Sequence, residues 1–375
     1  GGYTLIIAGN TVDTADGTVT YSIGKAATSQ TDTLSLYGNA TNAFSHIEVV
    51  TITSSAEIAV INIGDGTNTS TWAGNIDLSN ATNGKAIMNL NGAVISGVIS
   101  DGAVANAIEI NVLGDSTINN SANDLAHTDS GVTVTITDTK TLTMNDAMTI
   151  GAAGKFVLGT STAGGTFVAA AADTFLGLFD GPSAGVGILD INHNVTHTGI
   201  IGGTKLGLID IAASTTLAAS AAVSSTSVLF SGDGALTMVA DAVLTAAVTA
   251  TTGDQGTITF APTANDATIV VGDLGTSAKS LKVVTLGGDG SADTATVNGS
   301  IYAVTVNITG NHADAEVDMS ANKDITATNL IFTDEHTINL ATGSDITAAI
   351  TTTGGANEGE INVAGISKIT GEICL

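Results

Sequence analysis

The chain has 375 residues and a formal net charge of −26 at pH 7, with 43% hydrophobic but only 12% charged residues. All nine basic residues are lysines. Because arginine is the side chain that best clamps phosphates and base edges, an acidic chain without it is not expected to bind nucleic acid. The hydrophobic fraction excludes a disordered chain of the highly charged type. No apolar run approaches the roughly 18 uninterrupted residues of a membrane span, so none is predicted.

Short runs rich in Val, Ile and Thr recur along the chain, separated by Gly, Asn and Asp. Apolar and polar residues alternate within these runs, which is the period-two pattern of β-strands, and no long segment has helical periodicity. In chain order the predicted strands are 47–52, 58–63, 87–90, 108–112, 132–136, 188–191, 208–211, 228–230, 258–260, 283–286, 304–308 and 330–332.

The spacing of these runs is regular. The pentapeptides Gly187–Ile191 and Gly207–Ile211 are nearly identical and lie 20 residues apart, and the spacing elsewhere falls between 20 and 26 residues. A period of this length is typical of a solenoid. The predicted fold is therefore all-β, a right-handed parallel β-solenoid in which each strand pairs with its equivalents in the neighbouring turns, or rungs. A β-sandwich array is the alternative, since it also gives short strands at regular spacing.

The composition fits a thin, repetitive core. Val, Ile, Leu and Ala would fill the inward positions, and Gly and Asn would supply the positive φ that tight corners need. The chain has only 2 Pro, as expected when every interior rung must donate its N–H groups to a neighbour.

One segment interrupts the strand pattern. Residues 167–179 are rich in Phe and Ala and could form a short helix or a lateral flap, and Pro182 follows them. We therefore predict an N-terminal solenoid segment at 1–165, a flap or connecting insertion at 166–186, and a C-terminal solenoid segment at 187–375.

A family resemblance lies in the second half of the chain. Gly272–Gly290 contains a Gly-Asp-Leu-Gly turn followed by a Leu-Lys-Val-Val strand, and Val297–Ala303 reads Val-Asn-Gly-Ser-Ile-Tyr-Ala. These motifs resemble the repeat unit of large bacterial autotransporter passengers, in particular the rickettsial outer-surface antigens. The resemblance covers about residues 187–340 and implies an exported, surface-exposed β-helix. The family's C-terminal membrane anchor has no counterpart in these residues, so an excised passenger and an S-layer or filament subunit both stay open.

One motif matches a catalytic pattern. Gly181-Pro-Ser-Ala-Gly185 fits the G-x-S-x-G nucleophile elbow, with Asp190 and His193 or His197 downstream in the right order. The elbow requires a strand that leads into a helix, whereas the next run here is another strand. Pectate-lyase-type chemistry, the common enzymatic use of a β-helix, usually relies on Arg, which the chain lacks. We predict no catalytic residue and no cofactor-binding residue.

Two histidines and several Asp-rich turns are the candidate metal ligands. On a strand, His193 and His197 would lie roughly 13 Å apart, so a pair of surface histidines is favoured over a shared metal. Most Asp residues lie in turns such as Gly64-Asp-Gly66, Gly114-Asp115, Gly232-Asp-Gly234 and Gly287-Gly-Asp-Gly290. The last of these, continuing to Asp293, departs from the spacing of calcium-binding nonapeptide repeats. Ca²⁺ at Asp-rich turns stays open, but the metal ligands are unknown.

These patterns favour a non-enzymatic extracellular structural protein displayed on the bacterial surface. Residues 1–7 and 361–375 read as ordinary rungs with no capping helix, which predicts head-to-tail stacking of copies into a filament or layer, or truncation from a longer passenger. Cys374 is the only cysteine, so it is an unpaired thiol or a link to a second subunit.

Two alternatives belong to other functional classes. An autotransporter passenger adhesin would bind a host receptor or glycan through loops such as 160–184. A polysaccharide-active enzyme would need a carboxylate-lined groove, and it is the less favoured of the two because no carboxylate pair is singled out by the sequence.

Overall fold

The computed structural model describes residues 4–8, 20–23, 31–37, 46–49, 58–78, 84–100, 107–119, 123–125, 131–146, 148–150, 153–239, 243–261, 267–287, 294–309, 316–333, 335–353 and 359–374. These residues form strands and turns, with no helix among them. They belong to two compact units, residues 1–189 (unit 1) and 190–375 (unit 2). The short strand β21 (Ile188–Ile191) spans the boundary.

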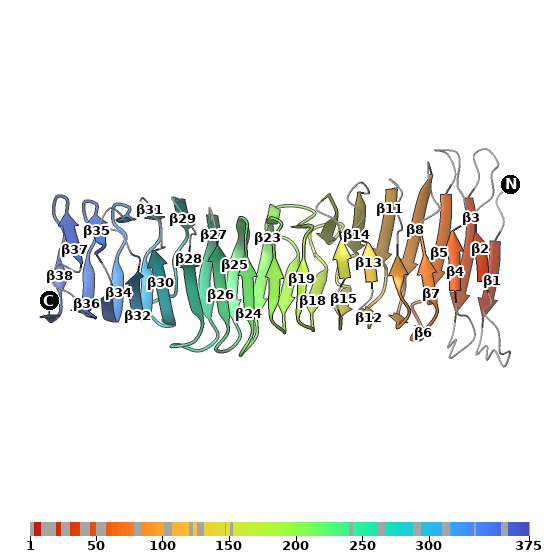
Figure 1. The fold of residues 1–375 in the computed structure, drawn as a ribbon, viewed down its shortest axis with the longest axis horizontal. Helices are drawn as coiled ribbons and strands as arrows, with labels where there is room; N and C mark the ends of the chain where they lie inside the picture. Colours follow the sequence, from red (N-terminus) through yellow and green to blue (C-terminus); the bar gives the residue numbers. More distant parts are fainter. Residues whose placement is uncertain are drawn as a thin grey trace. The chain divides into compact units, whose positions relative to one another are not determined.

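The described strands of unit 1 form three parallel ladders, in which strands from successive rungs lie side by side (Figure 1). The first ladder contains β1 (Thr4–Ala8), β3 (Thr31–Tyr37), β5 (Ile58–Ile63), β8 (Lys85–Leu90), β11 (Ala107–Val112), β14 (Val132–Ile136), β17 (Lys155–Leu158) and β20 (Leu178–Asp180). The second contains β6 (Ser70–Trp72), β9 (Ala93–Ile95), β12 (Ser116–Ile118), β15 (Thr141–Met144) and β18 (Thr166–Ala169). The third contains β2 (Thr20–Ile23), β4 (His46–Val49), β7 (Asn75–Asp77), β10 (Ile99–Ser100), β13 (Asn123–Leu125) and β16 (Met148–Ile150), and β19 (Asp173–Phe175) is a further short strand.

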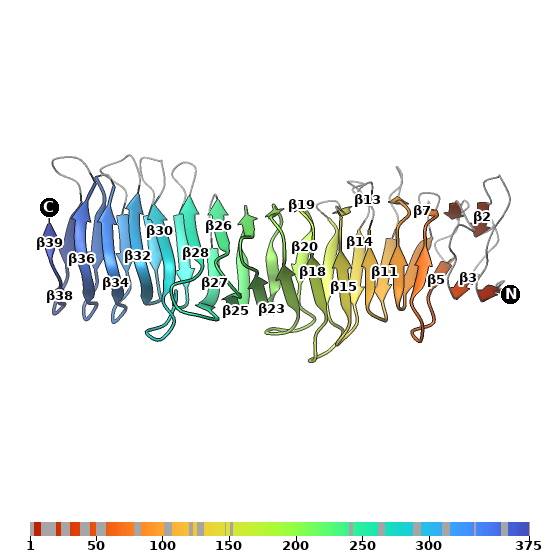
Figure 2. The same cartoon turned by 90° about the horizontal axis from the view of Figure 1, so that it is seen from below.

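The described strands of unit 2 form two parallel ladders (Figure 2). One ladder contains β23 (Ile201–Ile211), β25 (Val223–Phe230), β27 (Val243–Ala250), β29 (Ala267–Val271), β31 (Thr294–Val297), β33 (Glu316–Met319), β35 (Thr337–Leu340) and β37 (Glu360–Val363). The other contains β22 (Val195–His197), β24 (Thr216–Ala219), β26 (Ala235–Val239), β28 (Thr257–Ala261), β30 (Leu281–Gly287), β32 (Ile301–Thr309), β34 (Ile325–Phe332), β36 (Ile346–Thr352) and β38 (Ile369–Thr370), and β39 (Ile373–Cys374) also pairs with β36.

The pairing confirms the parallel β-solenoid. Within each unit, the strand pairs just described are all parallel, and the isolated antiparallel bridge between Thr276 and Lys279 lies within a turn. A β-sandwich array requires antiparallel sheets, so that alternative is wrong. Rung lengths are close to the predicted period, because Asn62 and its equivalent Asn89 are 27 residues apart whereas Asn339 and Asp318 are 21 apart.

Alternation places one face of each strand in the core. In β5 the side chains of Ala59, Ile61 and Ile63 are 1% exposed, and the intervening side chains are half-buried. Their register partners in β8 and β11 are buried as well, so each inward position becomes a continuous aliphatic column. Burial of one such side chain contributes about 1.5–3 kcal/mol.

The predicted helix or flap at 166–186 is wrong. Residues 166–169 and 178–180 are strands β18 and β20, which continue the ladders through β15 and β17. The side chains of Phe156, Phe167, Phe175 and Phe179 meet in the core, with ring centroids 4.7 to 6.1 Å apart. The phenylalanines are therefore inward-facing core residues of ordinary rungs. The chain divides after residue 189, close to the predicted division after 186.

Candidate functional site

The residues of the nucleophile-elbow motif lie in a turn. Ser183 is exposed, and its carbonyl oxygen accepts a hydrogen bond from the backbone N–H of Val186. The turn leads from β20 into β21, so the helix on which an elbow depends is absent from this stretch. Asp190 is half-buried, and burial together with the charge of Asp210 raises the pKa of its carboxyl group.

The prediction of two surface histidines is confirmed for His193 and wrong for His197. His193 is exposed, and its Nδ1 accepts the backbone N–H of Asn194 at 3.0 Å. His197 is buried, with 1% of its surface exposed. The reason is that strand alternation restarts at β22, which places both Val195 and His197 on the inward face.

The turn aspartates form hydrogen bonds and ion pairs that join one rung to another. Asp115 accepts the backbone N–H of Thr141 from the neighbouring rung at 2.9 Å, and Asp233 forms an ion pair with Lys282 at 2.5 Å. Within the described ranges, no three His, Cys, Asp or Glu side chains come together as a metal site would require. Of the Gly287 turn, residues 288–293 lie outside the described residues.

Cys374 is exposed and unpaired. Its thiol donates a 3.5 Å hydrogen bond to Glu372 Oε1. This bond and the negative charge of Glu372 raise the pKa of the Cys374 thiol. Because the thiolate is the reactive form, the raised pKa makes Cys374 a poor nucleophile.

A column of polar side chains, one serine and three asparagines, crosses four strands of unit 1. Ser35, Asn62, Asn89 and Asn111 occupy equivalent positions of β3, β5, β8 and β11. Each asparagine donates from Nδ2 to the preceding member, at 2.9 Å to Ser35 Oγ, 2.8 Å to Asn62 Oδ1 and 3.0 Å to Asn89 Oδ1. We call these four residues the unit 1 amide ladder.

A groove of about 380 Å³ lies beside this ladder, where the strands end. It is lined by Tyr37, Asn62, Gly64, Asp65, Asn89, Asn91 and Leu113. Four of these residues come from four successive rungs. Each directly follows the last inward residue of its strand: Tyr37 in β3, Gly64 after β5, Asn91 after β8 and Leu113 after β11. Figure 1 shows their strands β3, β5, β8 and β11 as neighbours in the same sheet.

Glycine shapes the floor of the groove. Gly64 has φ +88°, and a Cβ there would lie 2.2 Å from the backbone oxygen of Asn91. Only glycine fits this conformation and this approach. A Cβ at Gly66 or Gly114 would lie 2.7 or 2.6 Å from Asn91 Oδ1, so these glycines pack closely around the Asn91 side chain.

Asp65 contributes a carboxylate at the rim. Its Oδ1 accepts the backbone N–H groups of Thr67 at 2.8 Å and Asn68 at 3.0 Å. These bonds favour the charged form and lower the pKa of Asp65. Asp65 is therefore ionised at neutral pH, and the residues that line the groove include no lysine.

Unit 2 has a comparable column. Asn339 Nδ2 donates to Asp318 Oδ1 at 2.8 Å, and Asn362 Nδ2 donates to Asn339 Oδ1 at 3.2 Å. Asp318, Asn339 and Asn362 are register partners in β33, β35 and β37. We call them the unit 2 amide ladder. The positions that follow their strands hold Ser320, Ala341 and Ala364, all small.

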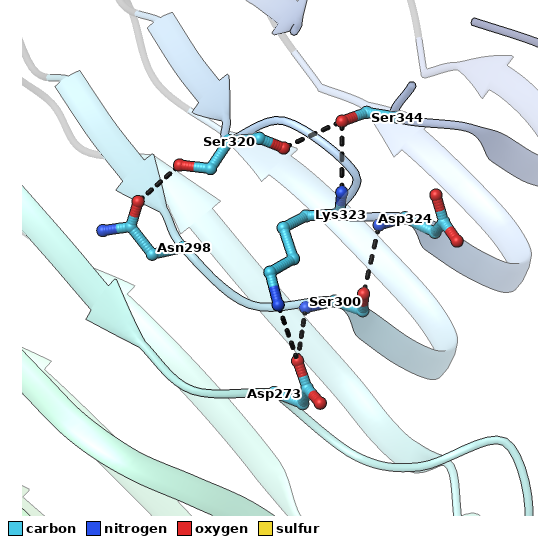
Figure 3. A network of polar contacts seen from close by, with 7 residues as sticks. All are labelled: Asp273, Asn298, Ser300, Ser320, Lys323, Asp324 and Ser344. Carbon is cyan, nitrogen blue, oxygen red and sulfur yellow. Dashed lines mark hydrogen bonds and ion pairs between the residues drawn. The ribbon is translucent and has the colours of Figure 1, made fainter. Parts of the chain in front are cut away.

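A second polar network in unit 2 joins the corners of successive rungs (Figure 3). Asp273 Oδ1 accepts the backbone N–H of Ser300 at 2.8 Å, and Ser300 Oγ accepts the backbone N–H of Asp324 at 3.2 Å. Lys323 Nζ lies 3.9 Å from Asp273 Oδ1, and the backbone N–H of Lys323 donates to Ser344 Oγ at 3.2 Å. Each of these bonds links one rung to another, which is what a structural role requires.

Sequence reasoning missed the groove. It noticed the Gly64-Asp-Gly66 turn and placed Asn62, Asn89 and Asn111 in or beside predicted strands. The available signal was the recurrence of Asn at an outward position in three consecutive strands. The rungs differ in length, with 27 residues between the first pair and 22 between the second, so this equivalence was not evident.

Comparison with known proteins returned no match among family models, curated proteins or solved structures. The resemblance to autotransporter passengers therefore stays a prediction from the repeat motifs. Among the strands and turns that the structure describes, there is no apolar helix of the length needed to cross a membrane.

Proposed function

We propose that this chain is a non-enzymatic structural protein of the bacterial exterior, in which the β-solenoid serves as a stiff, surface-displayed element. The observation that carries the proposal is the direction of its polar side-chain bonds. The amide ladders and the corner network all run from one rung to another of the same unit. Such bonds stiffen the coil, because bending or unwinding it would break many of them together.

The energetics support a mechanical role. A buried or half-buried hydrogen bond contributes about 1 kcal/mol net, so one ladder bond alone matters little. The ladder bonds link four successive rungs of unit 1 and three of unit 2, beside a core whose columns of Val, Ile and Leu are close to fully buried. A repeat protein sums such terms along its length, because each rung is stabilised by its neighbours.

Assembly of copies is part of this proposal. The apolar side chains of Val363, Ile366 and Ile373, which lie on or between β37, β38 and β39, are each exposed, at 46%, 89% and 53%. Exposed apolar side chains that gather in one place mark interaction surfaces, and we propose this role for these three residues. With a net charge of −26, copies repel one another at low salt. We therefore expect association to require screening or divalent cations such as Ca²⁺.

Electron microscopy and sedimentation velocity of the purified protein test the assembly. We expect dispersed particles in the presence of a chelator and larger regular assemblies after Ca²⁺ is added. Replacing Ile366 by Asp should abolish the assemblies while leaving the circular dichroism spectrum unchanged. Monodisperse particles under both conditions would contradict assembly.

The surface location needs a separate test. An antibody raised against the purified protein should label intact source cells, and protease added to those cells should remove the labelling. Labelling that appears only after the cells are permeabilised would contradict display at the surface.

A second candidate function is an adhesin that binds a glycan. The specific observation in its favour is the groove of unit 1. The predicted binding loops at 160–184 instead contain strands β18, β19 and β20.

A further inference from the structure

We propose that the groove lined by Tyr37, Asn62, Gly64, Asp65, Asn89, Asn91 and Leu113 binds an uncharged oligosaccharide. The inference rests on the second candidate function above and specifies its ligand, and it would stand even if the chain did not assemble. The inference rests on four properties of the groove: its size, its amide groups, its apolar residues and its charge.

The size suits a small ligand. Small-molecule sites commonly enclose 300–1,000 Å³, and this groove encloses about 380 Å³. It spans the rungs from Tyr37 to Leu113, which is roughly 14 Å at the usual spacing of hydrogen-bonded strands. That length favours a short oligosaccharide over a single sugar.

The amide groups retain hydrogen-bonding capacity. An asparagine amide has two donor hydrogens and an oxygen with two lone pairs. Within the ladder, Asn89 uses one hydrogen toward Asn62 and one lone pair toward Asn111. Each ladder amide between two neighbours therefore keeps one donor and one acceptor for a ligand. Vicinal hydroxyl groups of a sugar match such a pair, because each hydroxyl both donates and accepts.

Two less polar side chains complete the surface. The ring of Tyr37 offers an apolar face with a polar tip, which is suited to the C–H face of a sugar ring. Leu113, which follows β11, the last of the four strands, is 44% exposed and also lines the groove. A sugar presents both hydroxyl edges and apolar faces, so this combination distinguishes it from a purely polar ligand.

The charge of the groove selects against acidic ligands. Asp65 is ionised and exposed, and the lining residues include no lysine. The chain as a whole carries a net charge of −26. An acidic polysaccharide would be repelled. A neutral one would meet no charge repulsion, and its hydroxyl groups could donate hydrogen bonds to the Asp65 carboxylate.

The unit 2 amide ladder provides a matched control. Asp318, Asn339 and Asn362 repeat the amide spacing. The residues that follow the strands are Ser320, Ala341 and Ala364 instead of Tyr37, Gly64, Asn91 and Leu113. Amide spacing alone is thus present in both units, whereas the aromatic ring and the left-handed glycine of the groove are found in unit 1.

Isothermal titration calorimetry with the full chain tests the inference. The probes are the neutral hexasaccharides cellohexaose, maltohexaose, mannohexaose and xylohexaose, with hexagalacturonic acid as the acidic comparison. We expect at least one neutral probe to bind with Kd below about 1 mM and the acidic probe to bind more weakly. No binding by any neutral probe in that range, or tighter binding of the acidic probe, would overturn the inference.

Substitutions in the groove and in the unit 2 amide ladder test where the saccharide binds. Tyr37→Ala should weaken binding about tenfold through loss of stacking, and Tyr37→Phe should weaken it only a few-fold. Asn89→Ala should weaken binding, whereas Asn339→Ala should leave it unchanged. Circular dichroism shows whether each variant is folded, and the Phe variant and the unit 2 variant keep the test decisive if Tyr37→Ala does not fold. Equal affinity of the wild type, Tyr37→Phe and Asn89→Ala would overturn the inference.

Discussion

The amide ladders of the two units share one strand geometry and differ in what surrounds it. In unit 1, Asn62 and Asn89 lie beside Tyr37 and Gly64, and the result is a groove. In unit 2, Asn339 is followed two residues later by Ala341, and the first member of the ladder is the carboxylate of Asp318. Similar rung-to-rung bonding therefore accompanies the proposed saccharide groove in unit 1 and small residues in unit 2. We attribute the difference to the residues that follow each strand.

The largest effect is expected in the core that supports unit 1. Phe156 is fully buried and contacts the rings of Phe167, Phe175 and Phe179. Phe156→Ala should lower the free energy of unfolding by about 3–5 kcal/mol, because it leaves a cavity among the rings. Urea denaturation measures the loss. Phe156→Leu, which keeps most of the volume, should cost less than half as much, and equal losses would contradict the cavity explanation.

The next effect separates two left-handed glycines. Gly64→Ala places a Cβ 2.2 Å from the backbone oxygen of Asn91, whereas Gly343→Ala meets the Oδ1 of the exposed Asn322 side chain at 2.5 Å. Both variants suffer the strain of a positive φ, about 1–2 kcal/mol, but only the first must move backbone. Gly64→Ala should therefore be the more destabilising in thermal unfolding. If Gly343→Ala were equally destabilising, the close backbone approach at Gly64 would not be the cause.

A smaller effect compares the ladders directly. Asn339→Ala removes a donor to the Asp318 carboxylate, whereas Asn89→Ala removes a donor to the neutral Asn62 amide. Hydrogen bonds to charged groups contribute more, so we expect losses of about 1.5–2 kcal/mol for Asn339→Ala and about 1 kcal/mol for Asn89→Ala. Chemical denaturation of both variants provides the comparison. The reverse order would contradict the assigned partners.

The smallest effects concern pH and have opposite signs in the two units. In unit 1, hydrogen bonds from Ser161 and Thr160 lower the pKa of Asp138 to about 2. The stability from Asp138 is therefore present above its ordinary value of 3.8 and is lost as the pH falls from 3.8 toward 2. In unit 2, burial raises the pKa of Asp190, so its charged form is disfavoured and stability declines as the pH rises through the raised value.

Carbon-detected NMR titration of the Asp carboxyl groups measures both shifts. We expect Asp138 to titrate below pH 3.8 and Asp190 above it. Asp190→Asn should remove the decline in stability with rising pH, and Asp138→Asn should reduce the sensitivity to acid. Titration of both groups at their ordinary value would contradict the environments described above.

Much of the fold could be predicted because its signal is local. Alternation within 58–63 and 132–136 predicted strands β5 and β14, and the near repeat of Gly187–Ile191 at Gly207–Ile211 predicted stacked rungs. The segment after Thr166 was misread because its alanine run suits a helix in isolation, and only packing against neighbouring rungs turns its phenylalanines inward.

The groove could not be predicted for a different reason. It depends on residues 37, 64, 91 and 113, whose equivalence appears only after unequal rungs are brought into register. It also depends on the positive φ of Gly64, one of 45 glycines in the chain. Likewise, the inward position of His197 follows from where alternation restarts after a turn, which the spacing from His193 does not reveal.

The contrast between the two ladders is tested most directly by the side-chain amide resonances of ¹⁵N-labelled protein during titration with the neutral hexasaccharide that binds best. We predict that the resonances of Asn62, Asn89 and Asn91 shift with the saccharide, whereas those of Asn339 and Asn362 stay in place. Equal shifts in both ladders, or shifts confined to Asn339 and Asn362, would contradict the assignment of the groove as the binding surface.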